Sequence, residues 1–302
     1  FYKEFKLGAV SFNKGIYGTM IVYAPIKNNQ LNITISNHKT KDQTSPIGLL
    51  QNSYSNAQNY KLGFTKYNKK SYINFIIENY KMEYGIPEST EGHINGVDID
   101  LVKNTFQFNY HRDFLYKSFN QLDIKYNFID YEHREFENNA NYYAVSLANK
   151  THNINIMLKS KNLFFGIESN YKQFSPGGFY WTPKTDEIDL SIYSFYEKAY
   201  NNFILLSSFR TGYLSINPQK NNLFVSNIDI EEIRIRNFQY FSSSVGIKKI
   251  IHKFEINSWI MNTMRAPRVE ELYSDGPHLG SYAYEIGEPN LELEKTYGIE
   301  SS

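Results

Sequence analysis

Residues 104–110 read NTFQFNY and place aromatic and polar side chains in strict alternation. Phe106, Phe108 and Tyr110 share one face of an extended chain, and the residues between them are polar. Successive side chains of a β-strand point to opposite faces, so this period of two predicts a strand with one apolar side. Aromatic side chains also fit a pleated surface. The stretch predicts a sheet that is apolar on one face and polar on the other.

The same alternation recurs along the chain, while helical periodicity is nearly absent, so we expect an all-β fold. It is clear in LDIKYNF at 122–128 and around Ile188, Leu190 and Ile192. About fourteen strands are expected. They span residues 2–12, 15–25, 29–39, 58–67, 70–83, 98–112, 118–136, 150–160, 162–174, 186–198, 201–216, 235–248, 252–266 and 291–302.

The links between these strands alternate between short and long, and only the link at 13–14 breaks the pattern. In an up-and-down sheet alternate links lie at the same end, so one end has tight turns and the other has extended loops. That asymmetry is typical of outer-membrane barrels. A soluble all-β protein with irregular loops is the alternative. The strand lengths and the opposition of aromatic and polar faces favour the barrel. Short links are expected near 26–28, 68–69, 113–117, 161, 199–200 and 249–251, and long links near 40–57, 84–97, 137–149, 175–185, 217–234 and 267–290.

Composition excludes several other classes of protein. The chain has 302 residues and no cysteine, so it contains no disulfide and no thiolate metal site. Its net charge of +1 and the lack of a basic stripe argue against nucleic-acid binding. No run of 18 apolar residues predicts a transmembrane helix. The chain starts with Phe1 inside an expected strand, without an initiator Met or a signal segment, so we expect a truncated N-terminus.

Two segments near the C-terminus, which contain Pro and Gly turns, resemble the signature of TonB-dependent outer-membrane receptors. They are RAPRVEELYSDGPHL at 265–279 and YEIGEPNLELEKTYGIE at 284–300. Three further segments, at 84–110, 126–139 and 174–197, are similar to the branch that includes zinc-scavenging receptors. The resemblance implies a transmembrane barrel of 22 antiparallel strands around an N-terminal plug. It assigns the whole of 1–302 to an incomplete barrel, with the plug and the TonB box outside it.

The resemblance implies an active importer in the outer membrane of a Gram-negative bacterium. Extracellular loops would capture a ferric siderophore, haem, cobalamin or a chelated metal. The TonB–ExbB–ExbD complex would supply energy through the plug, and no cofactor is implied. A porin-like or surface-binding barrel without energy coupling is the competing hypothesis. A soluble carbohydrate-binding or glycosidase β-fold is a third.

Aromatic loop residues are the candidate ligand contacts, because they offer flat apolar surface with polar tips. Packing of loop on loop, or an interfacial girdle, is the alternative role. The candidates are Phe179, Tyr180 and Trp181 in one loop and Tyr273, His278, Tyr282 and Tyr284 in another. His278 is expected to pack or hydrogen-bond within its loop.

A metal site and an active site find little support in the sequence. Histidine is a favoured zinc ligand, but His93 stands with only Glu88 and Glu91 in its loop, and a solvated histidine is the simpler interpretation. No GxSxG elbow or comparable catalytic context occurs, so the chain is not expected to be an enzyme.

Overall fold

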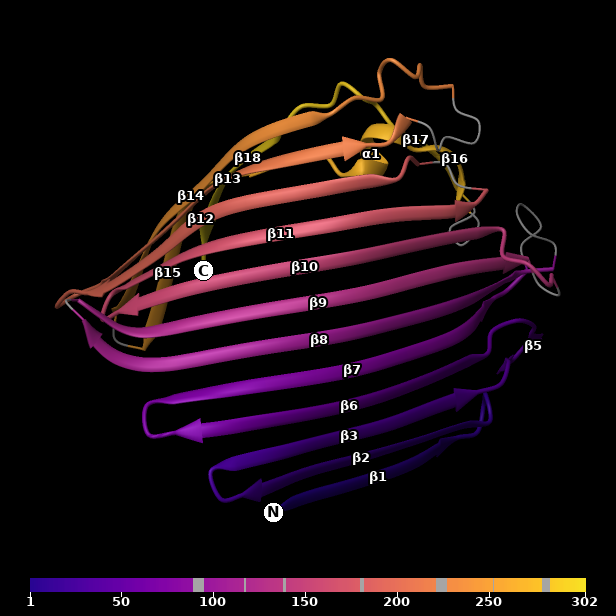
Figure 1. Ribbon diagram of the computed structural model, residues 1–302, viewed down its shortest axis with the longest axis horizontal. Coiled ribbons are helices and arrows are strands. Elements are labelled where there is room, and N and C mark those ends of the chain that lie inside the picture. Colours follow the sequence, from indigo (N-terminus) through magenta and orange to yellow (C-terminus); the bar gives the residue numbers. More distant parts are fainter. Residues whose placement is uncertain are drawn as a thin grey trace.

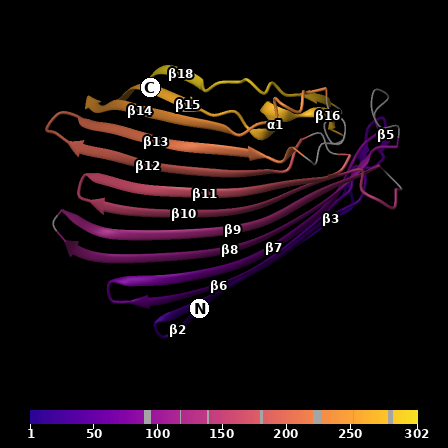
Figure 2. The same ribbon diagram turned by 45° about the horizontal axis from the view of Figure 1, so that its top comes forward.

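A computed structural model describes residues 1–88, 95–116, 118–137, 140–179, 182–220, 227–251, 253–278 and 283–302. Its main feature is one antiparallel sheet of 14 strands, in the order β1-β2-β3-β6-β7-β8-β9-β10-β11-β12-β13-β14-β15-β18 (Figure 1). The sheet curves into a wall, with β1 and β18 at its two edges (Figure 2). This is the partial, up-and-down antiparallel barrel that the alternation predicts. None of the described helices is long and apolar enough to span a membrane.

The strands of the sheet are long, and most of their bounds lie within three residues of the predicted ranges; β8, β10 and β11 extend further than predicted. They are β1 (Tyr2–Val10), β2 (Gly15–Ile26), β3 (Asn29–Thr40), β6 (Ser55–Asn68), β7 (Ser71–Ile86), β8 (Val97–Tyr116), β9 (Phe119–Glu137), β10 (Val145–Ser160), β11 (Leu163–Gly178), β12 (Thr185–Ala199), β13 (Ile204–Pro218), β14 (Arg236–Ile251), β15 (Phe254–Arg265) and β18 (Glu294–Ser301). Two small hairpins, β4 (Gln43–Ser45) with β5 (Gly48–Leu50) and β16 (Asp275–His278) with β17 (Ala283–Ile286), and a short helix, α1 (Val269–Tyr273), lie outside this sheet.

The predicted separation of short and long links is confirmed. The hairpins, α1 and the long links gather at one end of the strands, which we call the loop end (Figures 1 and 2). The opposite end, the turn end, carries the tight links between consecutive strands. The short link at 11–14 joins β1 to β2 at the loop end and is the exception that the sequence indicated.

The last strand differs from its predicted range. Strand β18 begins at Glu294, so Leu291 and Leu293 lie before it rather than in its ladder. The guanidinium of Arg236 donates a hydrogen bond of 2.7 Å to the Leu291 carbonyl, which ties this backbone to a side chain instead of to a neighbouring strand. The predicted start at residue 291 was therefore wrong.

The sheet has an inner face, defined as the face on which α1 packs. Phe174 of β11, Ile216 of β13 and Phe238 of β14 carry this contact. Phe174 pairs with Asn149, Asn149 with Tyr131, and Tyr131 with Lys103, so all four lie on the inner face.

Alternation then fixes the facing of the stretch 104–110. Asn109 shares the inner face and donates to Asn74 at 3.0 Å, whereas Phe106, Phe108 and Tyr110 lie on the opposite, outer face. The prediction of one polar and one apolar side is confirmed.

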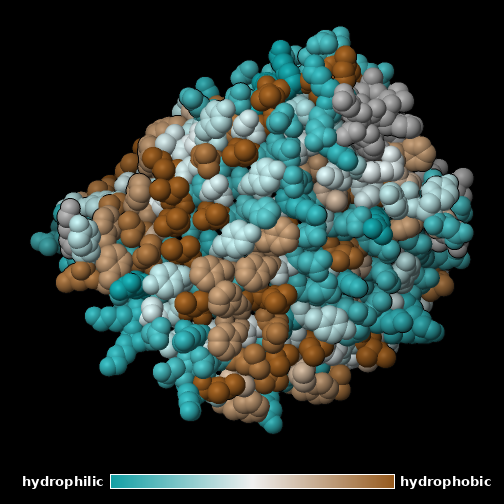
Figure 3. Space-filling view, in the orientation of Figure 1, coloured by the Kyte–Doolittle hydropathy of each residue, from teal (hydrophilic) through white to brown (hydrophobic). Residues whose placement is uncertain are grey.

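The outer face carries a continuous apolar band. Ile156 pairs with Ile167, and Ile167 pairs with Ile192, although these side chains are 40%, 48% and 41% exposed. Figure 3 shows apolar residues gathered across the strands, while hydrophilic residues dominate toward the loop end. Exposed apolar surface of this extent marks a contact with lipid or with another protein. Further exposed members of the band are Phe75, Ile77, Ile154, Ile188, Leu190, Val245 and Ile247.

The strands continue past the apolar band toward the loop end. On β8 and β9 the outer positions change there from aromatic to charged, with Asp98 and Asp100 on one strand and Glu132 and Arg134 on the other. Arg134 and Glu132 form an ion pair of 2.8 Å on this surface. The sheet therefore has an apolar zone near the turn end and a polar extension that reaches the loops.

Aromatic side chains cover glycines on neighbouring strands of the inner face. Gly246 pairs with Trp259, and Gly212 pairs with Tyr240. A Cβ atom at either glycine would overlap the aromatic ring opposite. Glycine is required at both positions because each ring lies directly on the neighbouring backbone.

Candidate ligand-binding site at the loop end

Helix α1 fastens the last long loop to the inner face of the sheet. Its five residues bury Val269, Leu272 and Tyr273, while the half-buried Glu270 and Glu271 lie between them, a spacing that suits one helical turn. The buried residues form a core with Phe174, Ile216 and Phe238 of the wall and with Ile233 of the link before β14. This apolar core gives the loop a fixed position, since burial of such side chains stabilises by about 1.5–3 kcal/mol each.

Tyr273 is entirely enclosed by this core. Its hydroxyl donates a hydrogen bond of 2.6 Å to the Arg234 carbonyl. Burial raises the pKa of the phenol, which therefore stays neutral and acts as a donor. Packing accounts for this tyrosine, and it is left out of the ligand contacts proposed below.

Three arginines hold the two motif segments of this loop together. Arg265, the last residue of β15, forms 2.8 Å contacts with Glu271 of α1 and with Glu294 of β18. The hydrogen bonds from Arg265 lower the pKa of Glu271. Arg234 donates to the Asn290 side chain at 2.9 Å, and Arg236 donates to the carbonyls of Pro289 and Leu291. The turn at 287–290 is therefore fixed by side chains of the link before β14 and of β14 itself.

The β16–β17 hairpin is joined to two neighbouring loops. Asp275 accepts a 3.0 Å hydrogen bond from the Tyr284 hydroxyl within the hairpin and another from the Asn227 backbone. The hydroxyls of Ser274 and Thr182 lie 3.1 Å apart. Because these contacts involve three different links, the loop end is one connected structure.

His278 connects the hairpin to the barrel wall. Its Nδ1 atom lies 2.9 Å from Glu285 of β17, and its Nε2 atom lies 3.3 Å from Oε1 of Glu135 on β9. His133 of β9 approaches the same Glu135 oxygen at 3.2 Å through its own Nε2 atom. Glu135 is completely buried. Two imidazoles thus converge on one buried carboxylate.

This arrangement changes the charge of His278 at neutral pH. Hydrogen bonding to Glu135, with a further contribution from Glu285, raises the pKa of His278 to about 9, although burial opposes the shift. The imidazole is therefore protonated at pH 7 and balances the buried carboxylate. A buried charge is costly unless it is paired, so the pair depends on both partners.

A recess of about 490 Å³ lies beside this ion pair, between α1, the hairpin and the wall. Its lining combines both signs of charge with apolar surface, and this mixture is typical of a site for a small polar ligand. The lining residues are Leu147, Phe174, Thr182, Arg268, Glu270, Glu271, His278, Glu285 and Ile286. The recess is the candidate ligand-binding site.

The predicted ligand contacts fall into different environments. His278 lines the recess and, as expected, bonds within its own loop. Tyr284 is 58% exposed and Phe179 is 54% exposed, and neither lines the recess. The remaining candidates, Tyr180, Trp181, Tyr282 and His93, lie outside the described residues.

The described residues contain no group of three or more acidic or histidine side chains arranged to hold a metal ion. The nitrogens of His133 and His278 instead face the Glu135 carboxylate directly.

Sequence reasoning missed Glu135 and His133. Both lie in the segment 126–139, on the inner side of β9 that also carries Asn127. Alternation within this strand places the two on the polar face, and charged residues facing the lumen near the loop end are the signal that could have identified them.

No family model matches the chain, and no curated protein matches it. Solved structures do match. The copper transporter OprC has a TM-score of 0.77 at 11% identity, covering 95% of this chain and 48% of that one. A double mutant of the Serratia marcescens hemophore receptor HasR, in complex with its hemophore HasA and heme, has a TM-score of 0.75 at 9% identity, covering 99% and 50%. The alcaligin outer-membrane receptor FauA from Bordetella pertussis has a TM-score of 0.59 at 10% identity, covering 88% and 44%.

These likenesses define the fold as that of an outer-membrane receptor and transporter barrel. The chain spans about half the length of the structures that it matches. The proteins compared here are named as transporters or receptors and not as enzymes.

Proposed function

We propose that this chain is part of a multi-pass receptor in the outer membrane of a Gram-negative bacterium, which binds a scarce nutrient at its loop end and imports it. The observation that carries the proposal is the recess beside His278 and Glu285, on the inner face of a wall whose outer face is apolar. A nutrient that enters from the loop end reaches this recess before it reaches the lower part of the lumen.

The lining suits a bulky polar cargo. Arg268 would attract carboxylate or phenolate oxygens of a chelate, and Phe174 and Ile286 would contact its apolar parts. Ferric siderophores, haem, cobalamin and chelated metals share these properties. The names of the structural neighbours, a copper transporter and a hemophore receptor with heme, support this class of cargo.

Zinc is a narrower hypothesis, because it rests on the resemblance of segments such as 84–110 to the zinc-scavenging branch. His93 would take part in zinc capture under this hypothesis. Substitution of His93 with alanine is expected to leave uptake nearly unchanged. A large loss of zinc-dependent growth would support the zinc hypothesis.

Energy coupling is also part of the proposal. The resemblance of 265–279 and 284–300 to TonB-dependent receptors implies that the TonB–ExbB–ExbD complex drives import through a plug and a TonB box, neither of which is in this chain. The barrel would provide the rigid wall, in which lipid requires every backbone polar group to be paired.

The experiment is an uptake assay on the full-length receptor. A deletion strain and its complemented counterpart are compared under iron, zinc and cobalamin limitation, each tested separately. The proposal expects slower growth of the deletion strain under one limitation, restored by the gene. Growth equal to that of the parent under all of them, with no ligand bound by the purified receptor, would contradict it.

A passive porin-like or surface-binding barrel is the second candidate, favoured by the polar inner face, which could also line a channel. Loss of the TonB complex distinguishes the two functions. Uptake through an energy-coupled importer stops in a strain without TonB, whereas diffusion through a passive barrel continues.

A further inference from the structure

The turn end of the sheet is basic in a way that the import function does not require. Its links are residues 27–28, 69–70, 117–118, 161–162, 200–203 and 252–253, and none of them contains Asp or Glu. Lysines occur in each of these links except 200–203, which follows Lys198. Two links at the loop end carry acidic pairs instead, Glu231 with Glu232 and Glu270 with Glu271. The charge is therefore distributed unevenly between the two ends of the wall.

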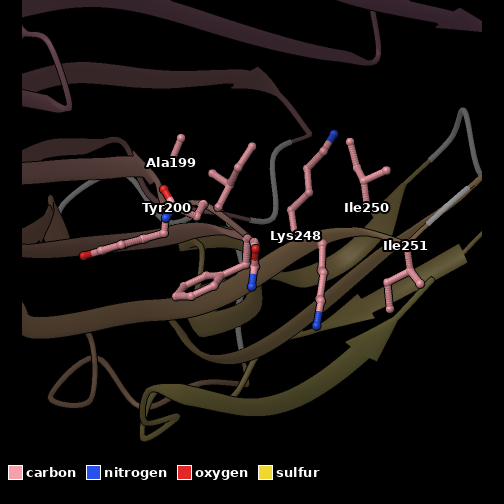
Figure 4. A pocket seen from close by; sticks show the side chains of 10 residues that line it. Ala199, Tyr200, Lys248, Ile250 and Ile251 are labelled. Carbon is pink, nitrogen blue, oxygen red and sulfur yellow. The ribbon is translucent and has the colours of Figure 1, made fainter.

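One turn adjoins a recess of about 610 Å³. It arises because β14 runs beyond its partner β13: Ile204 pairs with Lys248, and Lys249 to Ile251 pair only with β15. The turn 200–203 lies beside this overhang and closes the recess (Figure 4). Ile250 and Ile251 point to opposite sides of the strand, so Ile251 lies on the outer face and Ile250 on the inner one.

Aromatic rings form one wall of this recess. The rings of Tyr200 and Phe203 are stacked, with centroids 4.9 Å apart and planes inclined by 19°. The Lys198 ammonium lies 5.0 Å from the centre of the Tyr200 ring. Tyrosine and lysine with apolar neighbours are typical of the zone where a membrane meets water.

Two of the three nearby lysines are available to an anion. Lys248 forms a 2.8 Å ion pair with Glu255. Lys249 and Lys198 have no acidic partner within the described residues, and both lie on the outer face. Leu205, which pairs with both Lys198 and Ile247, continues the apolar band up to them. The occupant of this surface must therefore combine an anionic group with apolar chains.

We propose that this recess binds the headgroup of an anionic glycerophospholipid from the membrane leaflet at the turn end. Lys198 and Lys249 contact the phosphate, Tyr200 and Phe203 border the glycerol, and the acyl chains follow Ile251 and Ile247. The proposal depends on insertion of the barrel in a membrane but not on the identity of any imported cargo.

The test uses the full-length receptor in nanodiscs that contain equal amounts of phosphatidylethanolamine and phosphatidylglycerol, with bound lipids counted by native mass spectrometry. The parent protein is expected to retain phosphatidylglycerol preferentially. Lys198→Gln with Lys249→Gln is expected to reduce this retention by about fivefold for each lysine. The matched control, Lys81→Gln with Lys150→Gln, removes two outer-face lysines near the loop end and should change nothing.

A charge-preserving pair, Lys198→Arg with Lys249→Arg, should keep the lipid, and a heat-modifiable gel shift verifies that each variant is folded. Equal retention of both lipids by the parent protein, or an equal loss in the control pair, would overturn the proposal. If soluble glycerol phosphate displaced the bound phosphatidylglycerol, the recess would be a site for a free phosphate ester, and the proposal would be overturned as well. Uptake assays on the same variants separate this result from the import function.

Discussion

The Nε2 atom of His278 lies 3.3 Å from Oε1 of Glu135, so a residue of the last long loop is paired with a completely buried carboxylate of β9. The two residues are far apart in sequence, and their contact ties the β16–β17 hairpin to the wall. The pair lies at the edge of the recess to which we assign ligand binding.

The attachment of the hairpin should depend on pH. The pKa of His278 is raised from its ordinary 6.5 to about 9, so the stabilisation is complete below about 6.5 and is lost as pH rises through about 9. Limited proteolysis of the intact receptor should therefore cut the hairpin faster at pH 10 than at pH 6. His278→Gln should be cut at similar rates at both values. An unchanged pH dependence in that variant would assign the effect to another group.

The charged residues of the recess should control ligand capture. His278→Gln or Glu285→Gln should weaken binding of the imported nutrient about tenfold, because each breaks the charge-assisted pair that positions the hairpin side of the recess. The control is His38→Gln, an exposed histidine of β3 that does not line the recess. Binding is measured by titration of the purified receptor. If all three variants bind equally well, the recess is not the binding site.

The two faces of β8 should respond oppositely to a charge. Phe108→Arg places a guanidinium on the outer face within the apolar band and should cost about 2–4 kcal/mol, if the position lies near the bilayer midplane. Asn109→Arg places the same group on the inner face and should cost little. The free energies of unfolding in lipid vesicles provide the measurement. Similar values for both variants would refute the assigned facing.

The core under α1 should be sensitive to loss of volume more than to loss of a hydrogen bond. Tyr273→Ala removes a fully buried ring and should cost about 3–5 kcal/mol, whereas Tyr273→Phe removes only the bond to the Arg234 carbonyl and should cost about 1 kcal/mol. Thermal denaturation reports both changes. Hydrogen exchange at the loop end should rise in the alanine variant, and a rise confined to the turn end would contradict the assignment.

Much of the fold could be predicted from the sequence. The two faces of each strand meet different surroundings, so the polarity of the side chains alternates and shows which residues share a face. The alternation in 104–110 predicted which side chains face out, and the lengths of the links predicted which end carries the loops. Local patterns could not predict α1, since five residues are too few to show a helical period. The misplaced start of β18 has the same origin: Leu291 and Leu293 alternate like a strand, but Arg236, from a distant part of the chain, binds the Leu291 carbonyl.

The candidate site was harder to predict than the fold. His278 was identified from its loop, whereas Glu135 and His133 were passed over within a strand. A pair such as His278 and Glu135 is created by the curvature of the sheet and not by any spacing in the sequence. Tyr273 follows the alternative given for aromatic loop residues, because it packs against the wall and is fully buried.

The small apolar core beneath α1 has a bearing on inhibitor design. A loop that stays in place by its own packing needs no ordering when a molecule arrives, so less conformational entropy opposes association. A rigid inhibitor or an antibody that is selected against the ligand-free receptor should therefore bind the same loop surface that the natural cargo binds.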